Sequence, residues 1–376
     1  MEPAGSSTDA DVVDPAFSEL VERLLREADE GFFHRGAQLV VLRGDETLVD
    51  VAVGHGHLGT PLTGSTVHAL YCTAKPVLAV AVLRLVAEDE LSLDDRLGDV
   101  VEVDLPRWMQ ERTVEQVLGH TAGLHEPPSV WSRIIPESER LDWLRTYEPP
   151  PGWRFGIDRS YSEWAGWYVL GLAVEGLTGE GFDTYAARAV TGPYGVPDDD
   201  LALRLVGEQA DRVLARTSAT VDLAGPRPVP LLAEVGRDTA GEWNPAFGAY
   251  GTMRALARFY RGLLDDLAGA GRVLPQPLVG EMTRSRLPLT DDRTLGRPVA
   301  FGLGVMTTLS SHQFGDRVGG RTFGHAGQGG SSFAFADPDR DAVVALLCNA
   351  GLDAETALGF RRVSLADALC RALDAA

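Results

Sequence analysis

The stretch "YCTAKP", residues 71–76, runs directly into the apolar, helix-like segment "VLAVAVLRLVAEDEL". Cys72 and Lys75 are three positions apart, and one helical turn brings such residues onto the same face. Pro76 lacks the N–H that an interior turn needs, so the sequence predicts a helix that begins within about a turn before it. The positive end of that helix and the Lys75 cation would both favour a thiolate. Cys72 is therefore either an ordinary core cysteine or a nucleophile, and the stretch alone leaves both interpretations open.

The composition excludes several classes of function. The 376 residues suffice for two domains, or for one large domain with an insertion. The net charge of −20 repels nucleic acid and anionic membranes, so neither is expected as a partner. The apolar runs are too short to span a membrane. The three cysteines (Cys72, Cys348 and Cys370) are widely spaced, which favours a reduced, cytoplasmic protein without a disulfide or zinc framework.

The order of patterns along the chain predicts the architecture. Residues 1–16 form an acidic tail that is expected to be disordered, and residues 17–34 have the spacing of an amphipathic helix. Two β-rich runs joined by "RGDE" predict a hairpin over residues 36–56. Residues 92–295 are mostly helical in pattern, and strand character returns from residue 296, with "DPDRD" as a turn between two strands. A final helix precedes the C-terminus.

These patterns predict an α/β (α+β) fold. An antiparallel sheet is expected from residues 17–91 and 296–376, flanked by the terminal helices. Residues 92–295 are expected to form a mainly helical inserted domain, with the active site in the cleft between the two parts. Within the insertion, residues 201–243 are expected to form much of the pocket wall.

Two further motifs carry candidate functional residues. "YSE" (residues 161–163) follows a proline- and glycine-rich turn and precedes a helix, which places Tyr161 on a loop. Tyr161 is either functional or an aromatic packing residue beside Trp153 and Trp164. His325 begins the glycine-rich strand "HAGQGG", where glycines permit close approach of a ligand or another chain. A lone histidine in such a strand is more often structural than catalytic.

Other signatures are missing from the sequence. His55 and His57 have no third ligand at a suitable spacing, so a loop after a strand is expected there rather than a metal site. His120, in "GHTAGL", is expected to hold a turn through its side chain. No P-loop, dinucleotide-binding glycine motif or HExxH motif is found, and no cofactor or metal is expected.

The order of the three motifs is more specific than any of them alone. An S-x-x-K helix start, a Tyr-x-Asn loop and a Lys/His-x-Gly strand near the C-terminus recur together in penicillin-recognising serine enzymes. From about residue 17 to 372, this sequence resembles the class C β-lactamase and esterase branch of that superfamily. The branch includes D-aminopeptidases, carboxylesterases and transacylases of antibiotic biosynthesis. The resemblance is specific for the fold and much less so for the substrate.

The resemblance assigns roles by position. Cys72 would be the nucleophile, Lys75 would accept or relay its proton, and Tyr161 would be the second proton-transfer group. His325 matches the lysine of the third motif, and Gly327 would keep that strand open. The backbone N–H groups of Cys72 and Gln328 would form the oxyanion hole. The residues expected to bind substrate are Glu163, Gly327, Trp153 and Trp164.

Two positions depart from the family pattern. Cys72 stands where the family has serine, whether naturally or by engineering. A cysteine would form a thioester, which reacts with amines far more readily than with water. Glu163 stands where the family usually has asparagine. Its carboxylate would pair with Lys75, bind an ammonium group on an acceptor, or simply face solvent.

The leading functional hypothesis is transfer of an acyl group from a small ester or amide to an amine through acyl-Cys72. The alternatives are an intracellular esterase or amidase that uses water, and a non-catalytic ligand-binding homologue. Cys72 is expected to be the most reactive thiol, because Cys348 lies in an apolar strand and Cys370 on a terminal helix, without electropositive surroundings. The sequence carries no signal for the oligomeric state.

Overall fold

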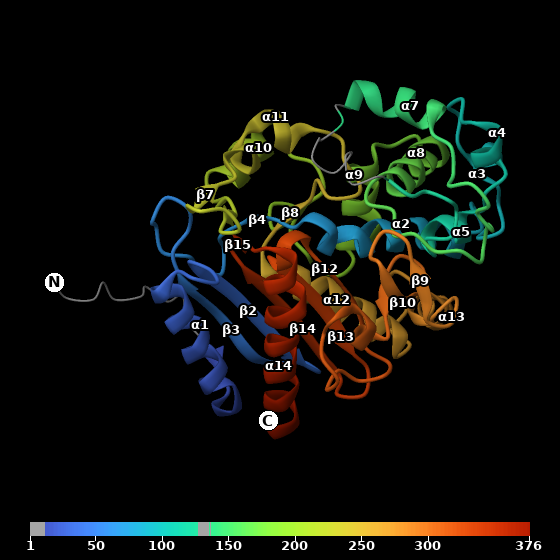
Figure 1. Ribbon diagram of the computed structural model, residues 1–376. Helices are drawn as coiled ribbons and strands as arrows, with labels where there is room; N and C mark the ends of the chain where they lie inside the picture. The colour runs from blue at the N-terminus through green and yellow to red at the C-terminus, as the bar shows by residue number, and fades with distance from the viewer. Residues whose placement is uncertain (1–11, 127–134, 136) are drawn as a thin grey trace.

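The computed structural model describes residues 12–126, 135 and 137–376. Its main element is a nine-stranded antiparallel sheet in which strands from the two ends of the chain meet (Figure 1). The expected antiparallel sheet is therefore confirmed. In sheet order, its strands are β1 (Val12–Val13), β3 (Glu46–Gly54), β2 (Gly36–Arg43), β14 (Ala342–Cys348), β13 (Ser332–Asp337), β12 (Phe323–Ala326), β11 (Met306–Thr307), β10 (Arg297–Phe301) and β9 (Thr290–Asp292).

Helices cover both faces of this sheet. The terminal helices α1 (Ser18–Glu30) and α14 (Val363–Ala375) lie on one face, as expected, and α12 (Met253–Leu267) lies on the other (Figure 1). Residues 253–267 were expected to belong to the helical insertion. Helix α12 instead packs its apolar side against β14 and β2, because the central strands are apolar on both faces and need a cover there.

The remaining helices lie mostly to one side of the sheet (Figure 1). They are α2 (Lys75–Ala87), α3 (Leu97–Val100), α4 (Arg107–Gln110), α5 (Val114–Leu118), α7 (Glu137–Thr146), α8 (Ala165–Thr178), α9 (Phe182–Ala186), α10 (Gly207–Leu214), α11 (Arg237–Gly241) and α13 (Gln276–Thr283), with short 3-10 or π segments η1 (Pro15–Phe17), η2 (Tyr71–Ala74), η3 (Ala187–Thr191), η4 (Leu232–Val235), η5 (Leu309–His312), η6 (Gln328–Gly330) and η7 (Glu355–Arg362).

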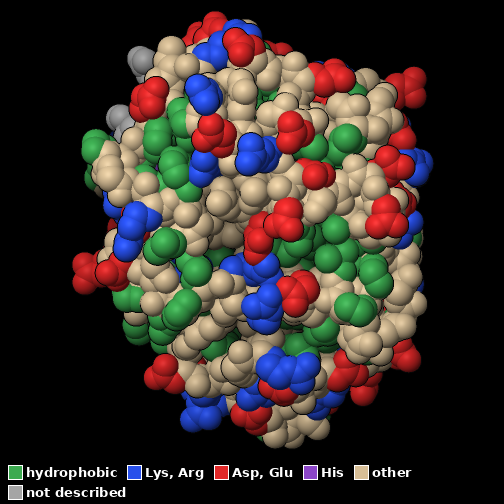
Figure 2. Space-filling view, turned by 90° about the vertical axis from the view of Figure 1, so that its right-hand side faces the viewer, with side chains coloured by type: hydrophobic (Ala, Val, Ile, Leu, Met, Phe, Trp, Pro, Cys, Tyr) green, Lys and Arg blue, Asp and Glu red, His purple; other side chains and the backbone are tan. Residues whose placement is uncertain are grey.

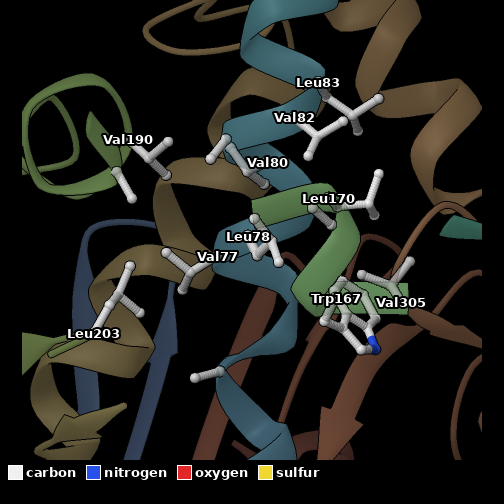
Figure 3. Close-up of a cluster of buried hydrophobic side chains, with 14 of the residues drawn as sticks. Val77, Leu78, Val80, Val82, Leu83, Trp167, Leu170, Val190, Leu203 and Val305 are labelled. Atoms are coloured by element: carbon white, nitrogen blue, oxygen red, sulfur yellow. The ribbon is translucent and has the colours of Figure 1, made fainter. Parts of the chain in front are cut away.

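Helix α2 is the buried axis of this part of the molecule. Val77, Leu78, Val80 and Val82 point in different directions around it, and each is fully buried. Figure 3 shows side chains of α8 and η3 packed around them. Burying one such side chain contributes about 1.5–3 kcal/mol, so the position of α2 is strongly fixed. A helix that is apolar on nearly all sides is a core helix. The first residues of α2, Lys75 and Pro76, are buried as well.

Two local predictions are tested directly. The hairpin of β2 and β3 and the turn between β13 and β14 are confirmed. The expectation of disorder over residues 1–16 is wrong for residues 12–16. Val12 and Val13 pair with the edge of β3, and η1 follows because Phe17 is fully buried. Residues 1–11 lie outside the described residues.

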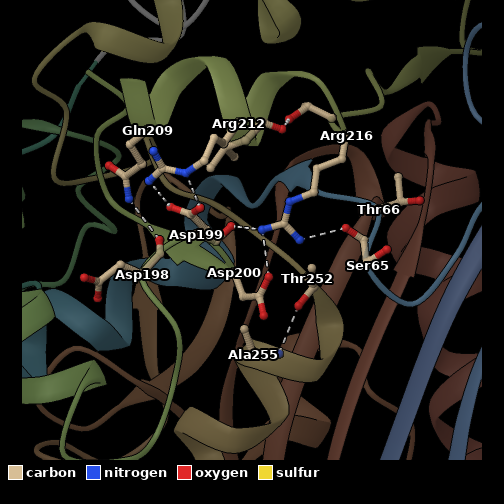
Figure 4. Close-up of polar contacts among 12 residues, drawn as sticks. Ser65, Thr66, Asp198, Asp199, Asp200, Gln209, Arg212, Arg216, Thr252 and Ala255 are labelled. Atoms are coloured by element: carbon tan, nitrogen blue, oxygen red, sulfur yellow. Dashed lines mark hydrogen bonds and ion pairs between the residues drawn. The ribbon is translucent and has the colours of Figure 1, made fainter. Parts of the chain in front are cut away.

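Two small three-stranded sheets connect the insertion to the main sheet. One has the order β4 (His68–Ala69), β8 (Tyr250–Gly251), β5 (Leu201–Ala202), and the other β15 (Ala350–Gly351), β6 (Val221–Asp222), β7 (Val229–Pro230). Figure 4 shows the polar contacts beside the first of these. Arg216 donates to the Ser65 carbonyl at 3.0 Å and pairs with Asp200 at 2.7 Å. The segment that follows β5 is thereby tied to the loop that leads to Cys72.

Acidic and basic side chains are interspersed on the face that carries α13 and β10. Figure 2 shows basic groups gathered near the middle of this face, with acidic groups around them. Arg284 and Arg286, which follow α13, both contact Glu281, at 2.6 and 2.7 Å. These arginines are thus paired within the protein and do not form a free basic patch. Within the described ranges, no helix has the length and apolar character needed to cross a bilayer.

Candidate active site

The start of α2 places the two residues of the opening motif side by side. The chain passes through the 3-10 turn η2 and continues as α2 from Lys75, so the helix begins within one turn of Pro76, as predicted. The Nζ of Lys75 lies 3.2 Å from the Sγ of Cys72. Lys75 is fully buried and Cys72 is 8% exposed. The sulfur therefore stands at the edge of the core with a buried cation behind it.

The residue before Cys72 has a strained backbone. Tyr71 has a φ of 50°, a left-handed conformation that costs on the order of 1–3 kcal/mol in a non-glycine residue. Its hydroxyl donates to the carboxylate of Glu234, which also accepts from the Thr220 N–H at 2.7 Å. Glu234 belongs to the segment 201–243 that was expected to wall the pocket. That segment holds the turn that presents Cys72.

Lys75 is surrounded by three acceptors. Besides the Cys72 sulfur, its Nζ donates to the backbone carbonyls of Glu163 at 2.7 Å and Ala246 at 3.0 Å. The ring of Tyr161 stands with its centroid 5.5 Å from the same nitrogen. The cation is thus held between the helical insertion and α2.

Tyr161 joins this group from the loop before α8. It is buried, and its ring stacks on Phe301 with centroids 5.8 Å apart. His120 supports the same loop: its Nδ1 accepts from the Ser162 N–H at 3.1 Å, and its φ is 59°. The expected turn-holding role of His120 agrees with this contact. The structure therefore brings Cys72, Lys75 and Tyr161 together from segments about 90 residues apart in the chain.

A buried carboxylate that the sequence analysis missed organises the same loop. Glu126 is 1% exposed and lies at the N-terminus of α8. It accepts from the Ser162 hydroxyl at 2.7 Å, the Ala165 N–H at 2.9 Å and the Glu163 N–H at 3.1 Å. A carboxylate at a helix N-terminus is favourable because it meets unpaired N–H groups and the positive end of the dipole. No local pattern around "LHEPP" indicated this contact, because its partners come about 36 residues later.

The carboxylate of Glu163 faces the sulfur. The thiol of Cys72 donates to its Oε2 over 3.6 Å, whereas Lys75 contacts only the backbone carbonyl of this residue. Of the alternatives open for Glu163, a purely solvent-facing position does not describe it, because this half-buried residue has its carboxylate in contact with Cys72. The Lys75 Nζ and the Glu163 carboxylate thus both contact the sulfur.

The third motif lies next to these residues on β12. His325 is fully buried, and its ring centroid is 5.9 Å from that of Tyr161. A Cβ on Gly327 would lie 2.4 Å from the Ser332 hydroxyl and 3.0 Å from the Thr73 hydroxyl, so only glycine leaves room for the 2.7 Å contact between those two hydroxyls. Gln328 follows on η6 with an exposed side chain.

Trp153 and Trp164 make contacts away from the sulfur. The indole N–H of Trp153 donates to the Thr121 carbonyl at 3.4 Å, and Arg293 lies over its ring at 4.9 Å. Trp164 packs against Trp143, with centroids 4.9 Å apart. These contacts are those of packing residues, the alternative that the sequence left open, and a substrate-binding role for either tryptophan stays a prediction.

Burial dominates the protonation of the site. It raises the pKa of the Cys72 thiol, although Lys75 acts in the opposite direction. Lys75 favours the thiolate, as expected, but desolvation outweighs it in the resting site. Burial and the adjacent sulfur and carboxylate raise the pKa of Tyr161 well above its usual value. Burial and the Lys75 cation hold the pKa of His325 well below its usual value, so this imidazole is neutral.

The surroundings of Cys348 also differ from the expectation. Arg361 Nη2 lies 3.0 Å from His34 Nδ1 and 3.8 Å from Cys348 Sγ. Burial opposes ionisation of this thiol, but His34 and Arg361 outweigh it and hold its pKa below the ordinary value. The prediction that Cys348 lacks electropositive surroundings is wrong, because the guanidinium of Arg361 reaches the sulfur from a segment outside its strand. Burial raises the pKa of the Cys370 thiol to about 11, in agreement with the expectation for that residue.

Among the residues that the structure describes, no group of three or more His, Cys, Asp or Glu side chains is placed to hold a metal ion. The candidate chemistry described below uses side chains and backbone groups of the chain itself.

Comparisons with known proteins bear on the family and the fold. A family model described as "Beta-lactamase" matches residues 21–368. The curated protein Esterase EstB from Burkholderia gladioli is 28% identical over 225 residues, which are 53% of this chain and 54% of that protein, so the alignment spans about half of each. Two solved structures share the fold. One, a family VIII carboxylesterase, has a TM-score of 0.76 at 21% identity, covering 99% of this chain and 100% of that chain. The other, described as EstCE1, a hydrolase with promiscuous acyltransferase activity, has a TM-score of 0.74 at 16% identity, covering 94% and 98%.

Proposed function

This chain belongs to the β-lactamase family, and from that premise we propose that it is an enzyme that transfers acyl groups through a covalent acyl-Cys72 intermediate. The observation that carries the proposal is the 3.2 Å contact between Lys75 Nζ and Cys72 Sγ at the start of a buried helix. A nucleophile needs a group that stabilises its anion at the moment of attack, and a buried cation does this strongly.

The proposed reaction has two half-reactions. The sulfur attacks the carbonyl carbon of a small ester or amide, and the alcohol or amine leaves, which yields a thioester on Cys72. The N–H groups of Cys72 and Gln328 are proposed to stabilise the oxyanion. An acceptor amine then attacks the thioester, and the thiol is released with formation of an amide. The thiolate is a good leaving group, and amines attack thioesters better than water does, so a cysteine favours transfer over hydrolysis.

The names of the relatives support an ester as donor. EstB and the family VIII carboxylesterase are described as esterases, and EstCE1 as a hydrolase with promiscuous acyltransferase activity. They also support the second candidate function, an esterase or amidase that uses water in place of the amine. A non-catalytic ligand-binding protein is disfavoured, because a buried lysine in contact with a thiol is not needed for simple binding.

The proposed partners are a small acyl donor and an amine acceptor, as in transacylases of secondary metabolism. A cytoplasmic location is proposed as well, because all three cysteines are free and buried, and buried thiols suit a reducing compartment.

Intact-mass spectrometry with an activated ester tests the proposal. The wild-type protein should gain the mass of one acyl group, on the peptide that contains Cys72. This species should persist in buffer and decay when a panel of amines is added, with release of the amide. Cys72→Ser should form an ester that amines attack less readily, which lowers the ratio of amide to acid product. Rapid hydrolysis that no amine affects would favour the esterase, and no acylation by any ester or β-lactam would favour a binding protein.

A further inference from the structure

The side chain of Lys75 is held by three hydrogen-bond contacts at its Nζ. Its Nζ contacts three acceptors: the sulfur of Cys72 and the backbone carbonyls of Glu163 and Ala246. An ammonium has three N–H donors, and a neutral amine has only two. A lysine that donates to all three of these groups is in its ammonium form. A protonated Lys75 stabilises a thiolate, but it has no lone pair with which to take the proton from the thiol.

In that form of the site, another group beside the sulfur accepts the proton. The thiol of Cys72 accepts from Lys75 and donates to the Oε2 of Glu163 over 3.6 Å. The other nearby titratable group, the phenol of Tyr161, holds its proton more tightly than usual, because it is buried beside the sulfur and the Glu163 carboxylate. Within the described residues around the sulfur, Glu163 is thus the carboxylate in direct contact with the S–H donor.

The position of Glu163 is fixed through its backbone. Its N–H donates to Glu126 at 3.1 Å, and its carbonyl accepts from Lys75 at 2.7 Å. With both backbone groups held, the side chain extends to the sulfur from a rigid loop. A catalytic group needs this preorganisation, because a displacement of about 1 Å costs about a hundredfold in rate.

We propose that Glu163 is the general base of this enzyme, which takes the proton of the Cys72 thiol and later that of the acceptor amine. This inference rests on the acyl-Cys72 function proposed above. It assigns to the carboxylate the proton transfer that the family pattern assigns to the lysine. The glutamate in place of asparagine and the cysteine in place of serine then form one functional pair.

The proton balance closes over the cycle. In the first half-reaction, the S–H proton moves to the Glu163 carboxylate while the sulfur bonds to the acyl carbon. The protonated Glu163 then gives that proton to the departing alkoxide, which leaves as the alcohol. In the second half-reaction, the amine nitrogen bonds to the acyl carbon and loses a proton to Glu163. That proton returns to the sulfur as the C–S bond breaks. The net reaction is ester plus amine to amide plus alcohol.

The electrostatic surroundings suit a base of this kind. Burial raises the pKa of Glu163, and the Lys75 cation opposes this change. The negative charge of Glu126 raises it further, and Cys72, Tyr161 and Asp292 are the other titratable groups that act with or upon this carboxylate. A raised pKa brings a carboxylate closer to working pH, where it both accepts and returns protons efficiently.

The pH profile of acylation tests this inference. The rate of thioester formation at Cys72 with an activated ester would be measured by quenched mass spectrometry from pH 4 to 9. In wild type, the rate should fall on the acid side as Glu163 becomes protonated. Glu163→Gln keeps the size of the side chain but cannot accept a proton, so the rate should fall about 10²–10⁴-fold and the acidic limb should vanish.

Glu126→Gln is the matched variant. It removes the negative charge behind Glu163 while an amide oxygen still reaches the loop. Because that charge raises the pKa of Glu163, its removal should move the acidic limb to lower pH without abolishing it. Glu163→Asp retains a carboxylate that is shorter by one methylene, and should keep the acidic limb at a reduced rate.

The outcomes separate this inference from the proposed function. If wild type is acylated at Cys72 and Glu163→Gln shows the same rate and the same acidic limb, Glu163 is not the base and the acyl-Cys72 enzyme stands. If wild type itself is never acylated at Cys72, the proposed function fails first. If Glu163→Gln does not fold, as judged by circular dichroism, the decision passes to Glu163→Asp, for which an unchanged rate would also overturn the inference.

Discussion

Cys72 and Cys348 are both buried and both lie close to a cation, yet their surroundings differ in one respect. Cys72 stands between the Lys75 ammonium and the Glu163 carboxylate. Cys348 stands beside Arg361, which also contacts His34, and these two residues hold the pKa of the thiol below its ordinary value. By thiolate stability alone, Cys348 would be chosen as the nucleophile. The pKa of Cys72 is raised instead.

The difference shows that a stable thiolate and a useful nucleophile are distinct. The sulfur of Cys348 contacts Arg361, and Arg361 is also bound to Glu27 on α1, which makes the cluster a structural contact between α1, β14 and η7. At Cys72 a cation and a proton acceptor flank the same sulfur, so the proton can leave and return. Catalysis through a covalent intermediate needs this reversibility, because the sulfur must also depart.

The largest contrast is expected from removal of each sulfur. Cys72→Ala should abolish the acyl-enzyme in intact-mass experiments, because no other group attacks the donor. Folded Cys348→Ala should be acylated at Cys72 at the wild-type rate, because the Cys348 thiol takes no part in the chemistry. Circular dichroism would confirm that both variants are folded. Acyl mass found on the Cys348 peptide, or persisting in Cys72→Ala, would reverse the assignment of the two cysteines.

Removal of the cation beside each sulfur should separate function from stability. Lys75→Met keeps much of the side-chain volume, and acylation should fall about 10²–10³-fold through loss of thiolate stabilisation. Arg361→Met breaks a buried ion pair with Glu27 and should lower the free energy of unfolding by about 3 kcal/mol, near the low end for such pairs because Glu27 retains Arg23 as a partner.

Urea unfolding and acylation kinetics would be measured on both of these variants. Folded Arg361→Met should be acylated at the wild-type rate. An equal loss of acylation in the two variants would show that the cluster around Cys348 also supports the active site.

The sequence was sufficient to predict features whose causes are local or whose order is specific. The helix start at Cys72, the hairpin of β2 and β3, and the antiparallel sheet from both chain ends were predicted from Pro76, turn residues and the sequence of motifs. The expected meeting of Cys72, Lys75 and Tyr161 came from the family resemblance, since nothing local brings Tyr161 to a sulfur about 90 residues earlier.

The features that the sequence did not predict depend on contacts between distant segments. Glu126 reaches the loop of Tyr161 from outside any motif, and Arg361 reaches Cys348 from η7. The direction of the Glu163 carboxylate was open, because backbone contacts at both ends of that residue decide it. Desolvation at Cys72 was also underestimated, since burial is a property of the folded core that no three-residue spacing reveals.

The smallest expected effect is a difference between two titration midpoints. The rate of alkylation by iodoacetamide follows the thiolate fraction, so its dependence on pH reports the pKa of each thiol independently of access. Because the pKa of Cys72 is raised from 9.0 and that of Cys348 is lowered from 9.0, labelling of Cys348 should reach its midpoint at a lower pH than labelling of Cys72. Peptide mapping after brief labelling at each pH resolves the two profiles.

In Arg361→Met, loss of the cation should move the Cys348 midpoint upward and leave that of Cys72 in place. Coincident midpoints in wild type would mean that the two sulfurs have equivalent surroundings, and the contrast between a structural contact and a proton-exchanging nucleophile would fail.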